Sequence, residues 1–394
     1  MESLEQMINR LCPQGVKYEK LGDICEIRRG VRVVKKQLSD SDGYPVYQNS
    51  LTSLGMYQSN NRKAGTTFVI CAGAAGEIGY CNTEFWAADD CSTVESDVLN
   101  DRFIYFYLMT QQNKLKSQVR KASVPRLSRD AIESLSIPLP PMEIQNRIVE
   151  VLDKMTTLTA ELEAELEAEL EARKRQYEYY RNKLLTFNEI GGGIRQVTWM
   201  KINEIGTIYR GIAYSKKDFT ETGTPCIHYG QIYTRYGTFA NKTFTYVSEE
   251  LANGKRLAKK GDLVMAVTSE NMEDVGKCLA WLGEDDILVS NHACFIRHSL
   301  NPKYLAYFLQ TSYFFNYKKK ISKGVKVIDL DLNMFGDMLI PVPSMEEQER
   351  IVSILDRFEA LTTDLQIGLP AEIEARRQQY EYYRNKLLTF DQAA

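Results

Sequence analysis

The chain is poor in the residues from which metal centres and catalytic triads are usually built. It has three histidines, His228, His292 and His298, and none lies at metal-ligand spacing from cysteines or carboxylates. Its eight cysteines never form a Cys-x-x-Cys pair, and several lie in apolar runs such as that around Cys71. We therefore expect no metal site, no Ser, Cys or His triad, and reduced cysteines that belong to hydrophobic cores.

Long hydrophobic runs are also missing. No segment approaches the length of a membrane span, and mean hydropathy is -0.34. The first residues, starting at Met1, lack the basic and apolar regions of an export signal. Hydrophobic content is nevertheless 44%, enough for well-formed cores. We expect a cytoplasmic protein of two or three domains that has no membrane partner.

The chain lacks a strong charge of either sign, because its net charge is only -3. Divided along the sequence, the charge is +1 over residues 18–141 and +3 over 197–344, but -4 over each of 142–190 and 345–394. Any attraction to phosphate would therefore be concentrated in the two mildly basic segments. A solvated surface of mixed charge gives similar totals, so this pattern does not decide the function.

What the chain does contain is an internal duplication. Residues 137–187 align without a gap on residues 340–390, and the stretch 176–187 recurs unchanged at 379–390. Segments of unequal sequence precede the two copies, so variable and constant segments alternate along the chain. Two domains with different surfaces would therefore be attached to the same repeated constant structure. We divide the chain into an N-terminal segment (1–17), a first variable domain (18–141), a first constant segment (142–190), a second variable domain (197–344) and a second constant segment (345–394).

Both constant segments are expected to be long helices. No helix breaker interrupts the first copy between Pro141 and Gly191. Apolar residues recur at helical spacing at 148, 151, 152, 155 and 158, and again at 351, 354, 355, 358 and 361. Two such stripes would bury each other in an antiparallel pair. In the second copy the run from Gln366 to Pro370 should break or kink the helix, because proline cannot continue an interior turn.

Three four-residue repeats lie in the first copy, at Thr159–Leu162, Glu163–Leu166 and Glu167–Leu170. Four residues turn a helix by about 400°, so the leucine stripe winds slowly around a partner, and three repeats rise about 18 Å. We interpret the run as a packed spacer rather than a solvated linker. The spacer leucines are Leu158, Leu162, Leu166, Leu170, Leu355 and Leu361.

The two variable domains are distant repeats of one fold. Residues 21, 24, 27, 29 and 30 match residues 202, 205, 208, 210 and 211 at an offset of 181. Buried strands are expected at 66–71, 261–267 and 287–290, and core helices at the aromatic runs 103–108 and 304–309. The predicted fold class is α+β. Two α+β domains are separated by two long helices packed as an antiparallel coiled-coil pair, with a pseudo-twofold internal repeat.

Two short motifs imitate catalytic sites. The glycines from Gly73 to Gly79 are spaced like those of a phosphate loop, but no βαβ unit surrounds them, so we predict a turn between strands. Asn301-Pro302-Lys303-Tyr304 resembles the Asn-Pro-Pro-Tyr/Phe element with which amino-methyltransferases hold a flipped adenine. Lys303 replaces the second proline and a helix follows at once, so we expect no catalytic role.

Three sequence elements resemble those of the specificity (S) subunits of type I restriction-modification systems. They are the repeated element at 137–149 and 340–352, Leu-Gly-Asp-Ile at 21–24 and Gly-Asp-Leu-Val at 261–264. The resemblance covers essentially the whole chain. Its four-residue repeats are similar to the spacer of the subfamily called type IC, and its one departure is Ser344 in place of a second proline.

This resemblance implies a DNA-binding subunit without an activity of its own. Two target-recognition domains would each read one half of a bipartite site in double-stranded DNA, and the conserved helices would bind two methyltransferase (M) subunits. Restriction (R) subunits would complete the complex. The S-adenosylmethionine and ATP would be bound by these partners, and no cofactor by this chain.

DNA contacts need Arg or Lys for phosphate and guanine, and Asn or Gln for adenine. The candidates lie in loops or at strand ends, next to glycine or polar clusters. In the first domain they are Arg28, Arg29, Arg32, Lys35, Lys36, Gln48, Asn49, Arg62, Lys63 and Arg126. In the second they are Lys216, Lys217, His228, Gln231, Tyr233, Arg235, Lys323 and Lys326.

Two other functions remain open from the residues alone. One is a structural coiled-coil scaffold whose two domains bind protein or sugar, and salt-sensitive DNA binding would distinguish it from the first reading. The other is a self-contained methyltransferase, which would require S-adenosylmethionine binding by the isolated chain. The half-site sequences do not follow from the residues, because base readout depends on side-chain geometry and DNA shape.

Overall fold

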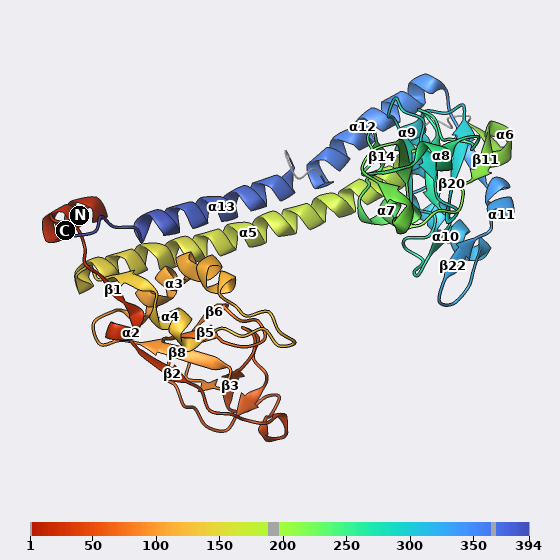
Figure 1. The fold of residues 1–394 in the computed structure, drawn as a ribbon. Coiled ribbons are helices and arrows are strands. Elements are labelled where there is room, and N and C mark those ends of the chain that lie inside the picture. The colour runs from red at the N-terminus through yellow and green to blue at the C-terminus, as the bar shows by residue number, and fades with distance from the viewer. Residues whose placement is uncertain (1, 188–196, 364–367, 394) are drawn as a thin grey trace. The chain divides into compact units, whose positions relative to one another are not determined.

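The computed structural model describes residues 2–187, 197–363 and 368–393, and the chain divides into two compact units (Figure 1). Unit 1 comprises residues 1–165 and 373–394, and unit 2 comprises residues 166–372. Each unit therefore combines one variable domain with the start of the constant segment that follows it and the end of the other constant segment.

Unit 1 contains the first variable domain. Its elements are α1 (Leu4–Leu11), β1 (Tyr18–Lys20), α2 (Leu21–Ile24), β2 (Glu26–Arg29), the 3-10 turn η1 (Lys35–Gln37), β3 (Tyr44–Tyr47), β4 (Met56–Tyr57), β5 (Thr66–Ile70), β6 (Ile78–Cys81), β7 (Trp86–Ala87), β8 (Cys91–Glu95), α3 (Asp101–Ser117), α4 (Arg129–Glu133) and β9 (Ser136–Pro138). An antiparallel sheet in the order β2-β8-β5-β6 forms its body, and α3 packs on β5 and β6.

Unit 2 contains the second variable domain. Its elements are β10 (Thr198–Lys201), α6 (Ile202–Ile205), β11 (Gly206–Arg210), η2 (Lys216–Asp218), β12 (Phe219–Thr220), β13 (Thr224–Ile227), α7 (Tyr229–Thr234), β14 (Phe239–Ala240), β15 (Thr245–Val247), α8 (Glu249–Ala252), β16 (Leu263–Ala266), β17 (Thr268–Ser269), β18 (Cys278–Trp281), β19 (Leu288–Val289), β20 (Ala293–His298), α9 (Pro302–Phe308), α10 (Ser312–Ile321), β21 (Ser322–Lys323), β22 (Ile328–Leu330), α11 (Leu332–Gly336) and β23 (Leu339–Val342).

The two variable domains repeat one topology. The sheet order β11-β20-β16-β18 in unit 2 corresponds to β2-β8-β5-β6 in unit 1, and β14 adds a fifth strand beyond β18. The predicted strands are confirmed as β5, β16 and β19, and the aromatic helices as the buried faces of α3 and α9. The glycine run after β5 leads into β6, as the predicted turn requires. Tertiary packing thus agrees with the α+β prediction.

A matched pair of glycines sits where each domain's first sheet strand ends. A Cβ atom added to Gly30 would lie 2.1 Å from the carbonyl oxygen of Ala88, and one added to Gly211 would lie 2.1 Å from that of Ser290. The backbone N–H of each glycine also donates to the sheet partner, Gly30 to Cys91 at 2.9 Å and Gly211 to Ala293 at 3.0 Å. Close approach of two backbones, and not loop flexibility, explains both glycines.

Buried glutamines join each variable domain to its helix. Asn100 caps α3, and its backbone N–H donates to Oε1 of Gln145 at 2.8 Å, while Nε2 of Gln145 donates to the Pro140 carbonyl at 2.8 Å. Unit 2 repeats this joint, because the backbone N–H of Asn301, the cap of α9, donates to Oε1 of Gln348 at 2.9 Å. The motif that resembles a methyltransferase element is therefore a helix cap.

The constant segments form helices α5 (Met142–Leu185), α12 (Met345–Thr363) and α13 (Leu369–Leu387). In unit 1, α13 runs antiparallel to the first part of α5, with Tyr380 hydrogen-bonded to Thr156 at 2.8 Å and Arg377 paired with Glu163 at 3.2 Å (Figure 1). In unit 2, the rings of Tyr177 and Tyr180 lie against that of Phe358 on α12. The antiparallel pairing of the constant helices is confirmed within each unit. The prediction that the two apolar stripes bury each other was wrong, because the stripe of α5 packs with the end of the second copy and the stripe of α12 packs with the end of the first.

The predicted break in the second constant segment is confirmed, because α12 ends at Thr363 and α13 begins at Leu369. Pro370 is the second residue of α13, in the first turn, where a missing backbone N–H costs no hydrogen bond. Gln366 and Ile367, which belong to the predicted breaking run, lie outside the described residues.

The spacer prediction was only partly right. Leu355 is fully buried, and Leu162, Leu166 and Leu170 are half-buried, as a packed stripe requires. Leu158 and Leu361, which occupy equivalent positions in the two copies, are instead exposed. The apolar stripe winds around its helix and turns away from the partner helix at these positions. The spacing of the leucines in the sequence therefore predicted a longer packed segment than the structure contains.

The two ends of the chain meet in unit 1. Val16 forms a parallel bridge with Gln392, and the Tyr18 hydroxyl donates to the Phe390 carbonyl at 3.1 Å. All eight cysteines are free, and Cys12 and Cys71 are half-buried while the others are buried. Burial raises the pKa of the Cys294 thiol to about 12, which keeps it protonated. No helix in the described part of the chain has both the length and the apolarity for a membrane span.

Candidate nucleic-acid interface

Equivalent basic turns precede the central strands of both domains. Lys35 and Lys36 lie on η1, and Lys216 and Lys217 lie on η2, at an offset of 181. All four side chains are exposed, and within the described residues none of them forms an ion pair. In unit 2 the turn is held by Ser215 and Asp218, whose carboxylate accepts from the Ser215 backbone N–H at 2.7 Å. Fixed turns that carry free lysines suit contact with phosphate groups.

A second group of candidates converges on Asp89 in unit 1. Arg29 donates from Nε to the Asp89 carbonyl at 2.7 Å, and Gln48 donates from Nε2 to its carboxylate at 3.4 Å. Arg28 is exposed but paired with Glu26 and, at 3.9 Å, with Glu95. Arg32 and Asn49 are exposed nearby in sequence. The fold thus brings Arg29 and Gln48 together, which the sequence did not reveal.

Arg62 is held inside its domain. Its side chain is 10% exposed, and it donates to the hydroxyl of Thr93 at 2.8 Å and to the carbonyls of Asn61 and Arg29 at 2.7 and 3.2 Å. Little of the guanidinium is left to meet DNA, so we correct its assignment to a structural one. Its neighbour Lys63 is exposed and lies 3.4 Å from Asp101, whose carboxyl pKa is raised by burial.

In unit 2 the candidates His228 and Gln231 are also buried. Nδ1 of His228 accepts from the Gly230 backbone N–H at 3.4 Å at the start of α7, and Gln231 binds the Thr245 hydroxyl at 3.2 Å. Burial lowers the pKa of His228, and nearby Lys216 and His292 lower it further. Both side chains therefore act first in positioning α7, while Tyr233 on that helix is half-exposed and Arg235 at its end is exposed.

Three further basic candidates lie in loops that follow the aromatic helices. Arg126 in unit 1 and Lys326 in unit 2 are exposed, and neither forms an ion pair in the described ranges. Lys323 is exposed and lies 3.6 Å from Asp331. All three belong to small hairpins that precede α4 or α11.

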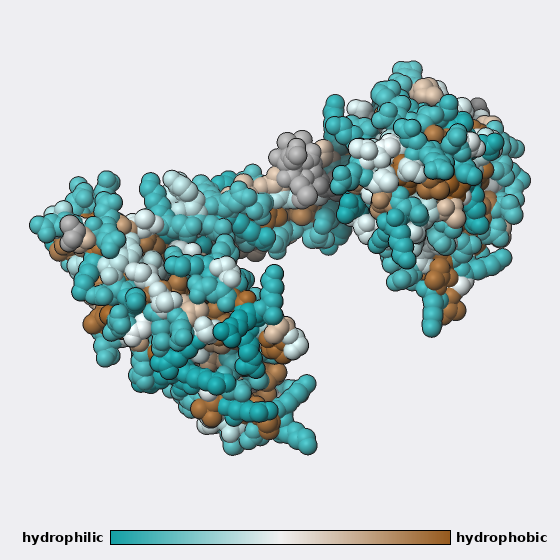
Figure 2. All heavy atoms as spheres, viewed as in Figure 1, coloured by the Kyte–Doolittle hydropathy of each residue, from teal (hydrophilic) through white to brown (hydrophobic). Residues whose placement is uncertain are grey.

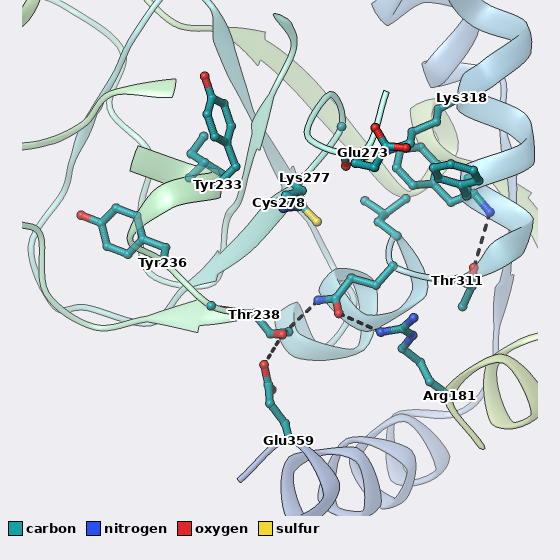
Figure 3. A pocket seen from close by; sticks show the side chains of 17 residues that line it. Arg181, Tyr233, Tyr236, Thr238, Glu273, Lys277, Cys278, Thr311, Lys318 and Glu359 are labelled. Carbon is teal, nitrogen blue, oxygen red and sulfur yellow. Dashed lines mark hydrogen bonds between the residues drawn. The ribbon is translucent and has the colours of Figure 1, made fainter. Parts of the chain in front are cut away.

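A cavity of about 340 Å³ in unit 2 was missed by the sequence analysis (Figure 3). Arg181, Gln310, Thr238 and Glu359 form a hydrogen-bonded chain along one side, including a bond of 3.0 Å from Gln310 to Thr238. On another side the Lys318 amine donates to the Val275 carbonyl at 2.6 Å. Burial lowers the pKa of Lys318 to about 8. These hydrogen bonds join the end of α5 and α12 to the body of the second variable domain.

Exposed tyrosines form a repeated surface on the helices. Tyr179 on α5 and Tyr382 on α13 are each more than half exposed, and they occupy the same position in the unchanged stretch of the duplication. Tyr180 and Tyr383 beside them are partly exposed, and the Tyr179 ring contacts that of Tyr180. Large exposed aromatic side chains at matched positions are typical of a docking surface.

Among residues 2–187, 197–363 and 368–393, no three His, Cys, Asp or Glu side chains come together as a metal would need.

A family comparison adds an independent finding. The family described as type I restriction modification DNA specificity domain matches residues 13–172 and 195–375. A Haemophilus influenzae protein named as a type I restriction enzyme specificity subunit is 31% identical, over 95% of this chain and 96% of that one. The EcoR124I/EcoR124II type I specificity subunit of Escherichia coli is 33% identical, over 73% of this chain and 70% of its own.

A solved structure is similar in fold. It comes from work on complex assembly and conformational transition of the type I R-M system, and it superposes with a TM-score of 0.70 at 16% identity. The alignment covers 95% of this chain and 98% of the other. At this identity the likeness concerns the fold alone.

Arg62→Ala is expected to destabilise unit 1, because the hydroxyl of Thr93 and the carbonyl of Arg29 would lose a buried donor. The loss should be about 1–3 kcal/mol in the free energy of unfolding, measured by denaturant titration. Arg32→Ala is the matched control, since Arg32 is exposed, and it should leave stability unchanged. If Arg62→Ala kept full stability and lost only DNA affinity, Arg62 would be a contact residue after all.

Proposed function

The chain belongs to the family of type I restriction-modification DNA specificity domains, and on that premise we propose that it selects the bipartite DNA site on which a type I complex acts. One observation carries the proposal. Two domains of the same topology but unequal sequence are joined to duplicated helices through the same buried glutamine contact. Such a chain presents two different binding surfaces that are attached in the same way to the constant helices. A DNA site with two unlike halves requires this arrangement.

Each variable domain would read one half-site. The exposed lysines of η1 and η2 would bind phosphates and fix the orientation of the domain. Base readout would come from neighbouring loop residues, such as Arg29 and Gln48 around Asp89 in unit 1. A cytoplasmic location follows from this proposal, because the target DNA lies there.

The chain is a non-catalytic subunit in this proposal. Methyl transfer to adenine from S-adenosylmethionine, and any ATP-dependent cleavage, would belong to M and R subunits. The residues agree with this division of labour, since Asn301 is occupied as a helix cap and Lys303 pairs with Asp356 at 2.8 Å. Neither residue is free to hold a flipped base.

The helices would bind two M subunits. The argument is the duplication itself, because Tyr179 and Tyr382 lie in the stretch that recurs without change and both are exposed. A surface that is present twice, once in each unit, fits two copies of one partner. Acidic charge on these segments, -4 on each, favours a partner surface that is basic there.

The decisive experiment is to co-express the chain with its M subunit and map N6-methyladenine across the host genome. We expect one bipartite motif with a fixed gap. Exchange of residues 18–141 for those of a relative should change one half of the motif and leave the other half and the gap intact. Methylation without a motif, or DNA binding that does not weaken as salt rises, would favour the protein-scaffold function instead.

Tyr179→Ala and Tyr382→Ala should each weaken the binding of one M subunit. Native mass spectrometry of the complex should detect two M subunits on the unaltered chain, mainly one on either single variant and mainly none on the double variant. The reason is that a central aromatic side chain contributes at least about 2 kcal/mol to the binding free energy of an interface. Phe244→Ala removes an equally exposed aromatic side chain from the variable domain and serves as the control. Two bound M subunits in the double variant would contradict the docking surface.

Deletion of Glu163–Leu166 tests whether helix length sets the gap between half-sites. Four residues fewer shorten a helix by about 6 Å and turn its two ends by about 40° relative to each other. The methylation motif should keep both half-site sequences and change its gap. Glu165→Gln, which keeps the length, is the control. An unchanged gap in the deletion variant would show that the length of this helix does not set the distance between the half-sites.

A further inference from the structure

Each unit carries a small hairpin between its aromatic helices and the short helix that follows. In unit 1, Arg120 and Arg126 pair through backbone hydrogen bonds of 2.9 and 3.3 Å and close a loop over 121–125. In unit 2, β21 and β22 pair with Ser322 opposite Leu330 and Lys323 opposite Asp329. These hairpins precede α4 and α11 respectively.

The two hairpins occupy equivalent places in the repeated fold. Before them, the caps Asn100 and Asn301 correspond at an offset of 201, and after them β9 and β23 correspond at an offset of 203. The extra residues of unit 2 lie before its hairpin, because the closing pair Arg120–Arg126 corresponds to Lys323–Asp329 at the same offset of 203. Equivalent placement, in domains whose sequences otherwise differ, indicates that the hairpins have the same task.

Each tip combines apolar and basic side chains. Val325 is 97% exposed and Val327 is 58% exposed, with Lys326 between them and Lys323 before them. In unit 1, Val124 is 47% exposed and lies between Lys121 and Arg126. Figure 2 shows hydrophobic and hydrophilic residues side by side where the loop beside β22 projects from unit 2.

The turn of the second hairpin depends on a glycine. Gly324 has a φ of +117°, and a Cβ atom there would lie 1.9 Å from the Val327 carbonyl oxygen. Glycine is therefore required, and the chain reverses tightly enough to leave Val325 without intramolecular cover. An apolar side chain exposed to this degree gains nothing from folding and is fully accessible to a partner.

The bases of both hairpins are anchored. In unit 2, Leu330 is fully buried, its backbone N–H donates to the Val267 carbonyl at 2.9 Å, and β22 pairs with β17. In unit 1, Leu127 is buried and its N–H donates to the Cys71 carbonyl at 2.8 Å. A rigid base with a projecting tip is preorganised, so binding would lose little conformational entropy.

The chemistry of the tips fits double-stranded DNA. The major groove of B-DNA is about 12 Å wide and admits a two-stranded β-ribbon. Lysine and arginine beside the tip would neutralise the phosphates that border the groove. Branched apolar side chains find one apolar group on the base edges there, the C5 methyl of thymine. A protein partner would more usually be met by apolar side chains without two flanking cations.

We propose that the two hairpins enter the major groove of the two half-sites, where Val124 in one and Val325 in the other contact thymine methyl groups. Lys121 and Arg126 in unit 1, and Lys323 and Lys326 in unit 2, bind the neighbouring phosphates. This proposal rests on the proposed function and deepens it, because it names the elements that read bases and the base that each tip recognises.

The test uses the full complex with M and duplexes that carry the mapped site. Each thymine of a half-site is replaced in turn by deoxyuridine, which lacks only the C5 methyl group. One such replacement in the half-site assigned to unit 2 should weaken binding about fourfold, the effect of one buried methyl-sized group. Val325→Ala should weaken binding to normal DNA by a similar factor and abolish the further effect of deoxyuridine at that position.

Lys326→Ala separates the phosphate contact from the base contact. It should weaken binding to all sequences alike and lower the slope of log affinity against log salt by about one. Val98→Ala is the matched control for Val325→Ala, because Val98 is 55% exposed in a loop of unit 1 outside the hairpin. It should change neither the affinity for DNA nor the salt dependence. Unchanged unfolding curves for these exposed positions show that the variants fold.

The outcomes distinguish this proposal from the one on which it rests. A bipartite methylation motif together with normal affinity of Val325→Ala, or a deoxyuridine effect that persists in that variant, overturns the hairpin proposal and leaves the function standing. A half-site for unit 2 without an A·T pair also overturns it. Absence of any methylation motif sinks the proposed function itself.

Discussion

The structure depends on one buried contact that is made twice. Gln145 and Gln348 each receive the backbone N–H of a helix-capping asparagine and donate to a proline carbonyl at the start of a constant helix. Loss of either glutamine side chain would leave buried polar groups without partners, each at a cost of about 1–3 kcal/mol. An ion pair supports each joint, Arg102 with Asp153 and Lys303 with Asp356, both at 2.8 Å. Variable sequence can therefore change on the far side of the domain while its attachment stays the same.

Helix pairing makes each unit a product of both copies of the duplication. The end of the second copy returns to unit 1, where Leu388 is buried beside Ile148 and Leu152, and the end of the first copy reaches unit 2, where Leu185 is buried with Leu355. Each apolar stripe thus gains its partner from the other copy, and neither copy buries its own stripe alone. This exchange agrees with the similarity of the two constant segments, because both must fit the same two kinds of partner surface.

Charge and residue type alone do not show which side chains are free to contact a partner. Arg62, His228 and Gln231 have the right chemistry for DNA, but the first binds carbonyls and a hydroxyl within its domain, and the others hold the start of α7. Lysines on η1 and η2 and at the hairpin tips are left exposed by the same folding. A sequence records that a residue can donate a hydrogen bond. Whether that donor is already used depends on neighbours that are distant in the chain, such as Thr93 for Arg62.

The sequence by itself determined the repeated architecture, because periodic apolar residues and glycine or proline breaks act locally. It predicted the strands β5 and β16, the buried aromatic helices and the end of α12 before Pro370. Only the tertiary structure decided that each apolar stripe packs on the end of the other copy, that Leu158 and Leu361 turn outward, and that Asn301 is a cap joined to Gln348. It also brought the exposed valines and basic residues of the two hairpins to equivalent places, since their equivalence depends on the sheets and helices around them and on no shared motif.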